Sequence, residues 1–533
     1  MDVTDFQYIS HTYNYNSVPP IGTGSHTEPV KDTVLRSIEY ANKNPFQYEK
    51  PKHKGIELTR QCQRQGVAQV TLEPQGFFHL PSAQSMIYDF CTRYSPAINT
   101  ASAATIEWAH KTSIGELGKG RQTLDVTTGQ CVKASAALER FCRFLKKNGM
   151  ATDFTLMSFC EAIWELFEME EVKFEQKVYK RIPRKYKGRN IYKKGRDYKW
   201  EVTVIKETLS GLEKNERIFE MLTTFATFRK DGERNKSKKR AIASPGIMLR
   251  ALFRIVEEFG KNLCKNITES TITTGGEEKK DKIQAALNQA STLMKDYDYV
   301  YLVTGDNTKW NEGMSSELFI RGLRSMMFFF TQVKDIIKDK ASLYNRTMLM
   351  KIFKTTFTAL FHKKVQMGSG KRAHDKSGHF YKYITVKELC DNPEMLKGKS
   401  REDFTNLARV CLSDGDCLVA PGMLMGMLNV LSTFVGLLGL TYNCDGTHDP
   451  EYRRMFREGT IEANYIREDL SQDLEVGVQF ATIPVARSIA CQSSDDFFVI
   501  VMGKSDQIAR DKIRELFSNC KVLGKCKVGL ICY

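Results

Sequence analysis

Residues 303–312 read VTGDNTKWNE and come directly after the apolar, β-favouring run 299–303. An apolar run of this length that ends in polar residues indicates a buried strand. We therefore expect Asp306 at the point where that strand ends. Taken alone, an Asp-Asn pair such as Asp306-Asn307 is usually a surface turn. A functional reading of this segment therefore depends on a second acidic segment farther along the chain.

The second acidic segment is residues 493–496, which read SSDD and precede the continuous apolar run 497–501. A Ser-x-x-Asp sequence is often the start of a helix, with the serine as N-cap. The run FFVIV that follows it favours a strand instead. Asp495 and Asp496 are therefore expected in a hairpin turn.

A carboxylate at a strand end and a carboxylate pair in a hairpin turn together supply the ligands that two magnesium ions need. Mg²⁺ prefers oxygen ligands in octahedral geometry, and two ions about 4 Å apart hold the attacking and leaving oxygens of a phosphoryl transfer. We expect Asp306, Asp495 and Asp496 to be catalytic and to bind Mg²⁺, with Mn²⁺ as the alternative ion. This chemistry is typical of template-directed polymerases.

The composition indicates a large intracellular protein with a polyanionic partner. A chain of 533 residues is expected to fold as about two to four subdomains. Its 79 Lys and Arg against 63 Asp and Glu give a formal net charge of +16, which suits nucleic acid or an acidic membrane. The 14 cysteines form no Cys-x-x-Cys pair, which favours reduced thiols, and the amino terminus lacks a secretory signal.

One uncharged stretch, residues 417–444, is long enough for a transmembrane helix, and the spacing of Gly422 and Gly426 would suit one. Against a membrane span are Pro421 at its start, the polar Asn429 inside it and the absence of basic clusters on its flanks. A buried core helix explains the stretch better, so we expect no membrane partner.

Two other segments are rich in Lys and Arg. In residues 177–199 nearly half of the positions are basic and tyrosines are interleaved, which is typical of phosphate binding and also of a nuclear import signal. A solvated charged loop has the same composition. The basic residues of 229–240 precede the first carboxylate strand and could hold an incoming triphosphate. The residues after this second segment, 241–246, should turn sharply before the helical pattern 248–259. Residues 80–170 contain further helix-period stretches, for example 135–144 and 156–167, and residues 341–405 read as a polar, basic insertion.

With these elements in order, the chain resembles the catalytic basic subunit of influenza-type (orthomyxovirus) RNA polymerases over almost its whole length. The strongest motifs are TGDNTKWNE at 304–312, SSDD at 493–496, PGMLMGMLNVLST at 421–433 and KSKKRAIASPG at 236–246. Weaker support comes from GGEEKK at 275–280, GKGRQT at 118–123 and the amino-terminal MDV. The Ser-Asp-Asp form, in place of Gly-Asp-Asp, is typical of segmented negative-strand viruses.

The resemblance implies roles for individual residues. Asp306 is similar to the aspartate that binds both metals, Asp495 to the one that completes the site, and Asp496 supports the metals more peripherally. The residues implied to bind the nucleotide are Lys230, Arg234, Lys236, Lys238, Lys239, Arg240, Lys309, Asn311, Gly422, Met423 and Asn429. Those implied to bind the RNA promoter are Lys185, Lys187, Arg189, Lys193, Lys194, Arg250 and Arg254. Lys239 replaces a family arginine, which keeps the charge but loses the bidentate fork.

The implied organisation has four parts. Residues 1–17 form a partner-docking arm, and residues 18–285 form the amino-terminal extension and fingers, with a basic ribbon at 177–199 and a basic finger motif at 229–246. Residues 286–524 form the palm with the catalytic motifs and finger insertions, including a helix at 507–523. Residues 525–533 are a tail that does not match the family.

The resemblance also implies partners and a location. The partners are the viral RNA promoter and template, nucleoside triphosphates, nucleoprotein and two further polymerase subunits. The acidic, endonuclease-bearing subunit would bind the amino terminus, whereas the docking region for the cap-binding subunit is expected to be missing from this chain. The implied location is the host nucleus, with the cytoplasm before import, and the virion ribonucleoprotein.

The expected fold is therefore an α+β right-hand polymerase with helical fingers and an antiparallel palm sheet, and with the thumb largely absent. The expected function is RNA-templated nucleotidyl transfer for transcription and replication of a segmented negative-strand RNA genome. The alternative is a truncated, non-catalytic form that binds RNA and partner subunits. Because the chain departs from the family after Gly524, apolar surface on strand 497–502 and on helix 507–523 is expected to remain uncovered.

Overall fold

The computed structural model describes residues 68–71, 79–119, 122–127, 130–151, 153–183, 185–186, 189–190, 198–229, 241–272, 275–306, 310, 316–328, 340–366, 417–419, 429–446, 484–523 and 529–532. These residues form a mixed structure of helices and small, mostly antiparallel sheets. The chain divides into two compact units. The first comprises Met1–Ala41, Ala104–Val256 and Thr347–Gly426, and the second comprises Asn42–Ala103, Glu257–Arg346 and Met427–Tyr533.

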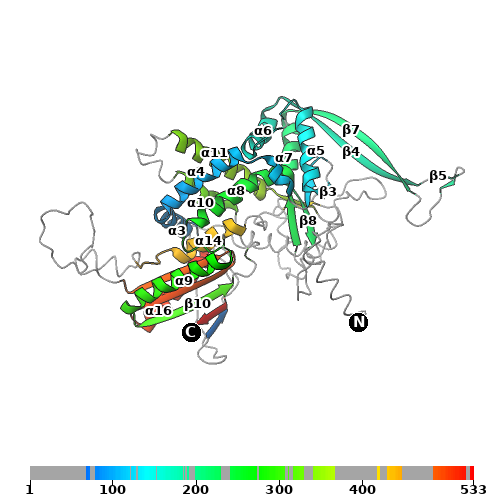
Figure 1. Cartoon of the computed structure of the whole chain (residues 1–533). Helices are drawn as coiled ribbons and strands as arrows, with labels where there is room; N and C mark the ends of the chain where they lie inside the picture. The colour runs from blue at the N-terminus through cyan, green and yellow to red at the C-terminus, as the bar shows by residue number, and fades with distance from the viewer. Residues whose placement is uncertain are drawn as a thin grey trace. The chain divides into compact units, whose positions relative to one another are not determined.

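The second unit is built around a three-stranded antiparallel sheet. Its strands are β10 (Tyr299–Asp306), β14 (Asp496–Gly503) and β13 (Ala486–Ser493), and β14 lies between the other two. Helices α9 (Gly276–Leu293), followed by the short η2 (Met294–Asp296), and α16 (Asp506–Leu523) lie alongside this sheet (Figure 1). The predicted strands around both carboxylate segments and the helix predicted at 507–523 are thus confirmed.

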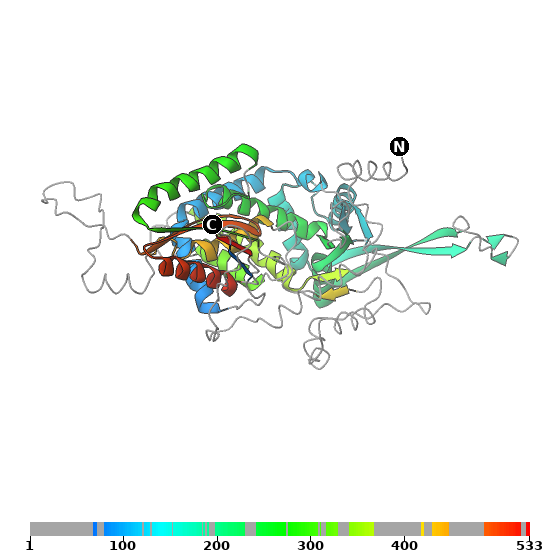
Figure 2. The ribbon, with the colours of Figure 1, turned by 90° about the horizontal axis from the view of Figure 1, so that it is seen from below.

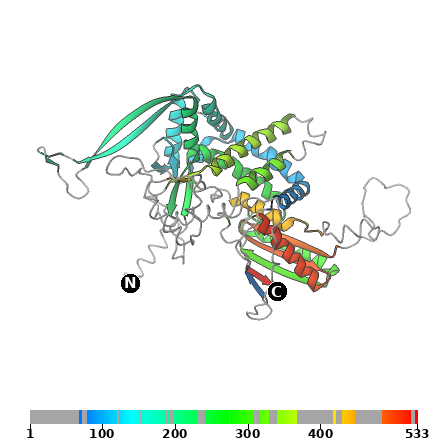
Figure 3. The ribbon, with the colours of Figure 1, turned by 180° about the vertical axis from the view of Figure 1, so that it is seen from behind.

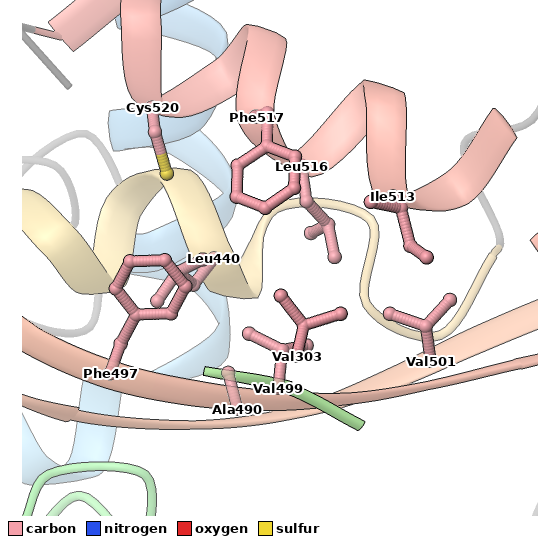
Figure 4. Close-up of a cluster of buried hydrophobic side chains, with 10 residues drawn as sticks. All are labelled: Val303, Leu440, Ala490, Phe497, Val499, Val501, Ile513, Leu516, Phe517 and Cys520. Carbon is pink, nitrogen blue, oxygen red and sulfur yellow. The ribbon is translucent and has the colours of Figure 1, made fainter. Parts of the chain in front are cut away.

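The central strand β14 is apolar from Phe497 to Met502 because both faces of the sheet are covered. Phe497, Val499 and Val501 belong to one cluster, which includes Val303 of β10 and side chains of α16 (Figure 4). The residues between them alternate to the other face, where Ile500 and Met502 pack with Ala290 of α9. An alternating pattern is expected only when one face meets water. The expectation of an uncovered apolar surface on this strand is therefore wrong.

Further helices of this unit hold the sheet in place. Helix α14 (Asn429–Thr441) is buried along its length from Leu431, and its Leu440 joins the cluster under α16. Phe434 of α14 packs edge-to-face on Phe90 of α3 (Leu80–Arg93), with ring centroids 5.0 Å apart. Helix α10 (Ser316–Phe328) lies beside α3. The prediction of a buried core helix in the uncharged stretch is confirmed for α14, and no helix in the described ranges is long and apolar enough to span a membrane.

Residues 525–533, which were expected to form an atypical tail, contribute a strand. Residues Gly529–Cys532 form β15, which pairs antiparallel with β1 (Ala68–Thr71) and lies beside β10. Figure 3 shows the blue β1 and the red β15 side by side. Two segments from opposite ends of the sequence therefore add to the second unit.

The first unit carries a long two-stranded ribbon. Strands β4 (Glu171–Pro183) and β7 (Tyr198–Ser210) pair antiparallel over their full length, followed outward by the short pair β5 (Lys185–Tyr186) and β6 (Arg189–Asn190). The ribbon reaches beyond helices α5 (Ala134–Lys147), α6 (Leu156–Glu168) and α7 (Gly211–Thr223) (Figure 2). The helical patterns predicted in the regions of α5 and α6 are confirmed.

A four-stranded sheet also belongs to this unit, with β12 (Cys417–Val419), β11 (Lys364–Gln366), β8 (Thr224–Arg229) and β9 (Ala241–Pro245) in that order. The pair β2 (Gln122–Asp125) and β3 (Gln130–Lys133) follows the short η1 (Ile114–Lys119). Helices α4 (Ser95–Lys111), α8 (Ile247–Lys265) and α11 (Lys340–Phe361) contain residues of both units.

Helix α11 corrects one sequence expectation. Residues 341–405 were expected to be a polar insertion, yet Phe353 and Phe357 of α11 are fully buried. The apolar positions recur at helical spacing among basic ones, so the average composition of the segment hides a packed face.

Candidate catalytic site

The register of the three-stranded sheet brings the two acidic segments together. Asp306 is the last residue of β10 and pairs with Asp496, the first residue of β14, which in turn pairs with Ser493 of β13. Directly paired residues of antiparallel strands have Cα atoms about 4.5–5.5 Å apart. The backbone of Asp306 therefore lies next to that of Asp496, as the predicted site requires.

The turn between β13 and β14 consists of two residues, Ser494 and Asp495, because Ser493 pairs with Asp496. Ser494 has a φ of 59°, which lies in the left-handed region. A positive φ at the first central residue suits a two-residue hairpin between right-twisted strands. The turn thereby places Asp495 at the tip, directly before Asp496.

Both aspartates were expected in the turn, but Asp496 is already paired in β14, and the two carboxylates differ in environment. Asp495 is half-buried and Asp496 is exposed. Partial burial, followed by the charge of Asp495, raises the pKa of Asp496, and the cation of Lys279 on α9 partly offsets this rise. Adjacent like charges raise the free energy of the ionised pair, so a cation bound between them would relieve the repulsion.

These residues fit a hard divalent cation. Carboxylate oxygens are the preferred ligands of Mg²⁺, and the mutual repulsion of Asp495 and Asp496 is the electrostatic condition that such an ion would relieve. Among the side chains that the structure describes, no group of three or more His, Cys, Asp or Glu is assembled to hold a metal. The remaining carboxylate, Asp306, is placed by its backbone alone.

Helix α14 contributes directly to the turn. The hydroxyl of Thr433 accepts a hydrogen bond from the backbone N–H of Ser494, with Oγ1 3.0 Å from N. Thr433 is fully buried and belongs to the motif at 421–433. The uncharged motif and the carboxylate motif are therefore parts of one structure.

Most of the predicted nucleotide-binding residues lie outside the described ranges. These are Lys230, Arg234, Lys236, Lys238, Lys239, Arg240, Lys309, Asn311, Gly422 and Met423. Asn429 is the first residue of α14. Strands β8 and β9 are paired at Arg229 and Ala241, so the basic segment connects the two strands of a hairpin. The sharp turn expected at residues 241–246 is instead strand β9 followed by α8.

The predicted promoter-binding residues lie on two elements. Lys185 and Arg189 belong to β5 and β6, whereas Lys187, Lys193 and Lys194 lie outside the described residues. Arg250 and Arg254 lie on α8 and are half-buried. The guanidinium of Arg254 lies 5.0 Å from the ring centroid of Trp108, so this cation already has an aromatic partner within the chain.

Residues around the turn that the sequence did not single out are Lys279, Thr433 and Gln492. Lys279 lies in the GGEEKK motif and Thr433 in the uncharged motif, so each had a sequence signal without an assigned role. Gln492 directly precedes SSDD. Its position beside the motif does not show which groups its side chain contacts.

The left-handed Ser494 gives a test of the turn geometry. A non-glycine residue in this conformation costs about 1–2 kcal/mol, and glycine costs about 0.5–1 kcal/mol more chain entropy. Ser494→Gly should therefore change the free energy of unfolding by between zero and about 1.5 kcal/mol in the stabilising direction. Ser493→Gly, within β13, should destabilise instead. Chemical unfolding of both variants checks the difference, and equal destabilisation would contradict the left-handed turn.

Comparison with known proteins identifies the family of the chain. The family model for the influenza RNA-dependent RNA polymerase subunit PB1 matches residues 1–451. The chain therefore belongs to this family, which confirms the resemblance drawn from its motifs.

Individual relatives are viral polymerase subunits. The chain is 26% identical over 526 residues to the RNA-directed RNA polymerase catalytic subunit of Influenza C virus (strain C/Johannesburg/1/1966). The same identity holds for the subunits of strains C/Ann Arbor/1/1950 and C/JJ/1950. Each match covers 98% of this chain and 61% of the relative, so the chain spans about three fifths of the length of these curated relatives.

Proposed function

We propose that this chain is the catalytic subunit of a viral RNA-directed RNA polymerase that transcribes and replicates a segmented negative-strand genome. The observation that carries the proposal is the pairing of Asp306 with Asp496, with Asp495 in the adjoining turn. Family membership supports it, because the relatives named above are polymerase catalytic subunits. The reaction is RNA-templated nucleotidyl transfer.

Asp306, Asp495 and Asp496 would hold two Mg²⁺ ions, or Mn²⁺ in their place. When bound, the ions supply positive charge that lowers the pKa of the primer 3′-hydroxyl and stabilises the leaving pyrophosphate. The chain holds the carboxylates on the central and neighbouring strands of a sheet whose two faces are packed. A rigid support of this kind keeps charged groups in place during the reaction.

The nucleotide would be bound by residues from several segments. The basic segment 230–240, between the paired ends of β8 and β9, would neutralise the β- and γ-phosphates. Asn311 would sense the ribose 2′-hydroxyl, with Lys309 nearby in sequence. Gly422 and Met423 would allow close approach of the backbone to the template and nucleotide, before Asn429 at the start of α14.

In this proposal the sheet of the second unit is the palm, and the helical first unit provides fingers. The β4–β7 ribbon, with its short β5–β6 extension, binds promoter RNA through its cations and carries the nuclear import signal. The chain would act in the host nucleus and in the virion ribonucleoprotein. Its partners would be nucleoprotein and the endonuclease-bearing subunit, the latter at residues 1–17.

Metal removal tests the proposal. The chain, assembled with its partner subunits on promoter RNA, should extend a primer in the presence of Mg²⁺ and stop when EDTA is added. Restoring Mg²⁺, or adding Mn²⁺, should restore extension, whereas Ca²⁺ should not, because its longer bonds and flexible coordination suit this chemistry poorly. If the assembled chain binds RNA but never extends the primer with either ion, the non-catalytic alternative is correct.

A further inference from the structure

We propose that Gln492 is a positioning residue for the catalytic turn and sets where Asp495 and Asp496 present their charges. This inference rests on the proposed function, because it assigns the purpose of the turn to metal binding. It concerns the contacts of one side chain, its backbone and the helix beneath it, all within the second unit.

The side chain of Gln492 binds the backbone of the turn. Its Nε2 donates to the carbonyl oxygen of Ser494 at 2.6 Å. The N–H of the same residue donates to Thr433, as described above. Both backbone polar groups of Ser494 are therefore held by side chains from β13 and α14, and this residue directly precedes Asp495.

The backbone of Gln492 is fixed independently of that side chain. Its N–H donates to the carbonyl oxygen of Glu269 at 2.8 Å, and its own carbonyl oxygen accepts from the N–H of Thr271 at 3.0 Å. Ser270 forms a parallel bridge with Gln492. The outer edge of β13 is thus hydrogen-bonded to the segment after α8, and the side-chain amide of Gln492 extends from a backbone that these bonds hold in place.

Helix α14 leaves a place for this amide at Gly436. A Cβ atom added to Gly436 would lie 2.4 Å from Cδ, 2.7 Å from Nε2 and 2.7 Å from Oε1 of Gln492. Any larger residue at this position would therefore displace the amide. Gly436 follows Thr433 by about one helical turn, so the same face of α14 receives both the turn and the amide.

The side-chain amide of Gln492 is poorly explained by a contribution to the free energy of unfolding alone. Gln492 is fully buried, and within the part of the chain that the structure describes its Oε1 has no hydrogen-bond partner. Burying an unsatisfied oxygen costs free energy, whereas an apolar side chain of similar length would avoid that cost. What the amide provides, and an apolar side chain does not, is the hydrogen bond to Ser494.

The test compares Gln492→Met, which keeps length and removes the donor, with Gly436→Ala, which displaces the amide. The matched control is Gly439→Ala on the same helix, whose added Cβ would meet Cys520 of α16 at 3.1 Å and not Gln492. Each variant is assembled with partner subunits and RNA. The readouts are Mn²⁺ binding, followed by the electron paramagnetic resonance signal of the free ion, the Mg²⁺ dependence of primer extension, RNA affinity and thermal unfolding.

Gln492→Met and Gly436→Ala should each weaken Mn²⁺ binding and raise the half-saturating Mg²⁺ concentration by about 10- to 100-fold, the usual effect of losing a group that orients a metal ligand. RNA affinity should stay unchanged, and Gln492→Met should unfold no earlier than the unmodified chain. Gly439→Ala should alter thermal unfolding alone.

Unchanged Mn²⁺ binding in both Gln492→Met and Gly436→Ala would overturn the positioning role. The proposed function would then stand if Asp306→Ala still removed both Mn²⁺ binding and primer extension. If the unmodified chain shows no metal-dependent extension, the proposed function fails, while the Mn²⁺ titrations still decide whether Gln492 orients the carboxylates. A loss of Mn²⁺ binding by Gly439→Ala equal to that of Gly436→Ala would also count against the proposal.

Discussion

Asp306→Ala and Asp495→Ala should each abolish nucleotide addition while leaving RNA binding largely intact. Each change would remove a carboxylate that we propose as a metal ligand, and the loss of one preorganised charge-stabilising group typically costs about 10²–10³-fold in rate. Asp496→Ala should cost less, because the resemblance assigns it a peripheral role. Single-nucleotide primer extension and fluorescence anisotropy with promoter RNA measure the two quantities.

Asp298→Ala is the matched control for these variants. Asp298 is an exposed carboxylate just before β10, at the end of that strand opposite to Asp306. It carries the same charge on the same chain segment and should leave the rate unchanged. Elongation by Asp306→Ala within tenfold of the unmodified chain would disprove the metal site.

Replacing Lys185, Lys187, Arg189, Lys193 and Lys194 with Ala should weaken promoter binding and flatten its dependence on salt. If all five contact phosphates, the slope of log affinity against log salt should fall by about 3.5, since each single-strand contact contributes about 0.7. Lys185 and Arg189 belong to the β5–β6 pair, which continues outward from the long ribbon.

A charge-preserving set provides the control for the ribbon. Exchanging Lys for Arg and Arg for Lys at the same five positions keeps the number of cations and should keep the slope. An unchanged slope in the alanine set would mean that this segment is a solvated surface or serves nuclear import only.

The sequence predicted those strands and helices whose pattern of apolar and polar residues follows from their own burial. The apolar runs on each side of the carboxylates predicted β10 and β14, but the turn is shorter than expected, because Asp496 is already paired in β14. The helix periodicity before 168 gave α5 and α6, and the uncharged stretch gave α14. In each case the apolar pattern of the element reflects which of its own residues are buried, so a short stretch of sequence is enough to show it.

Long-range pairings could not be predicted in the same way. Strand β1 pairs with β15 across almost the whole sequence, and four-residue strands carry too little pattern to show it. Gln492 contacts Ser494, Gly436 and the segment at Glu269, and only the folded arrangement of α14 and β13 brings these together. Polar residues within strands usually face water, so composition argued against a buried role for this one.

The central position of β14 also bears on how this protein can diverge from its relatives. Because Phe497, Val499 and Val501 face one packed layer and Ile500 and Met502 the other, neither side of the strand has a site for a charged residue. Accepted changes there should be exchanges among apolar side chains of similar volume. The β4–β7 ribbon, with its exposed residues at 203–208, can accumulate changes that preserve its charge. Over evolutionary time the catalytic strand should therefore drift within a narrow set of residues while the ribbon drifts widely.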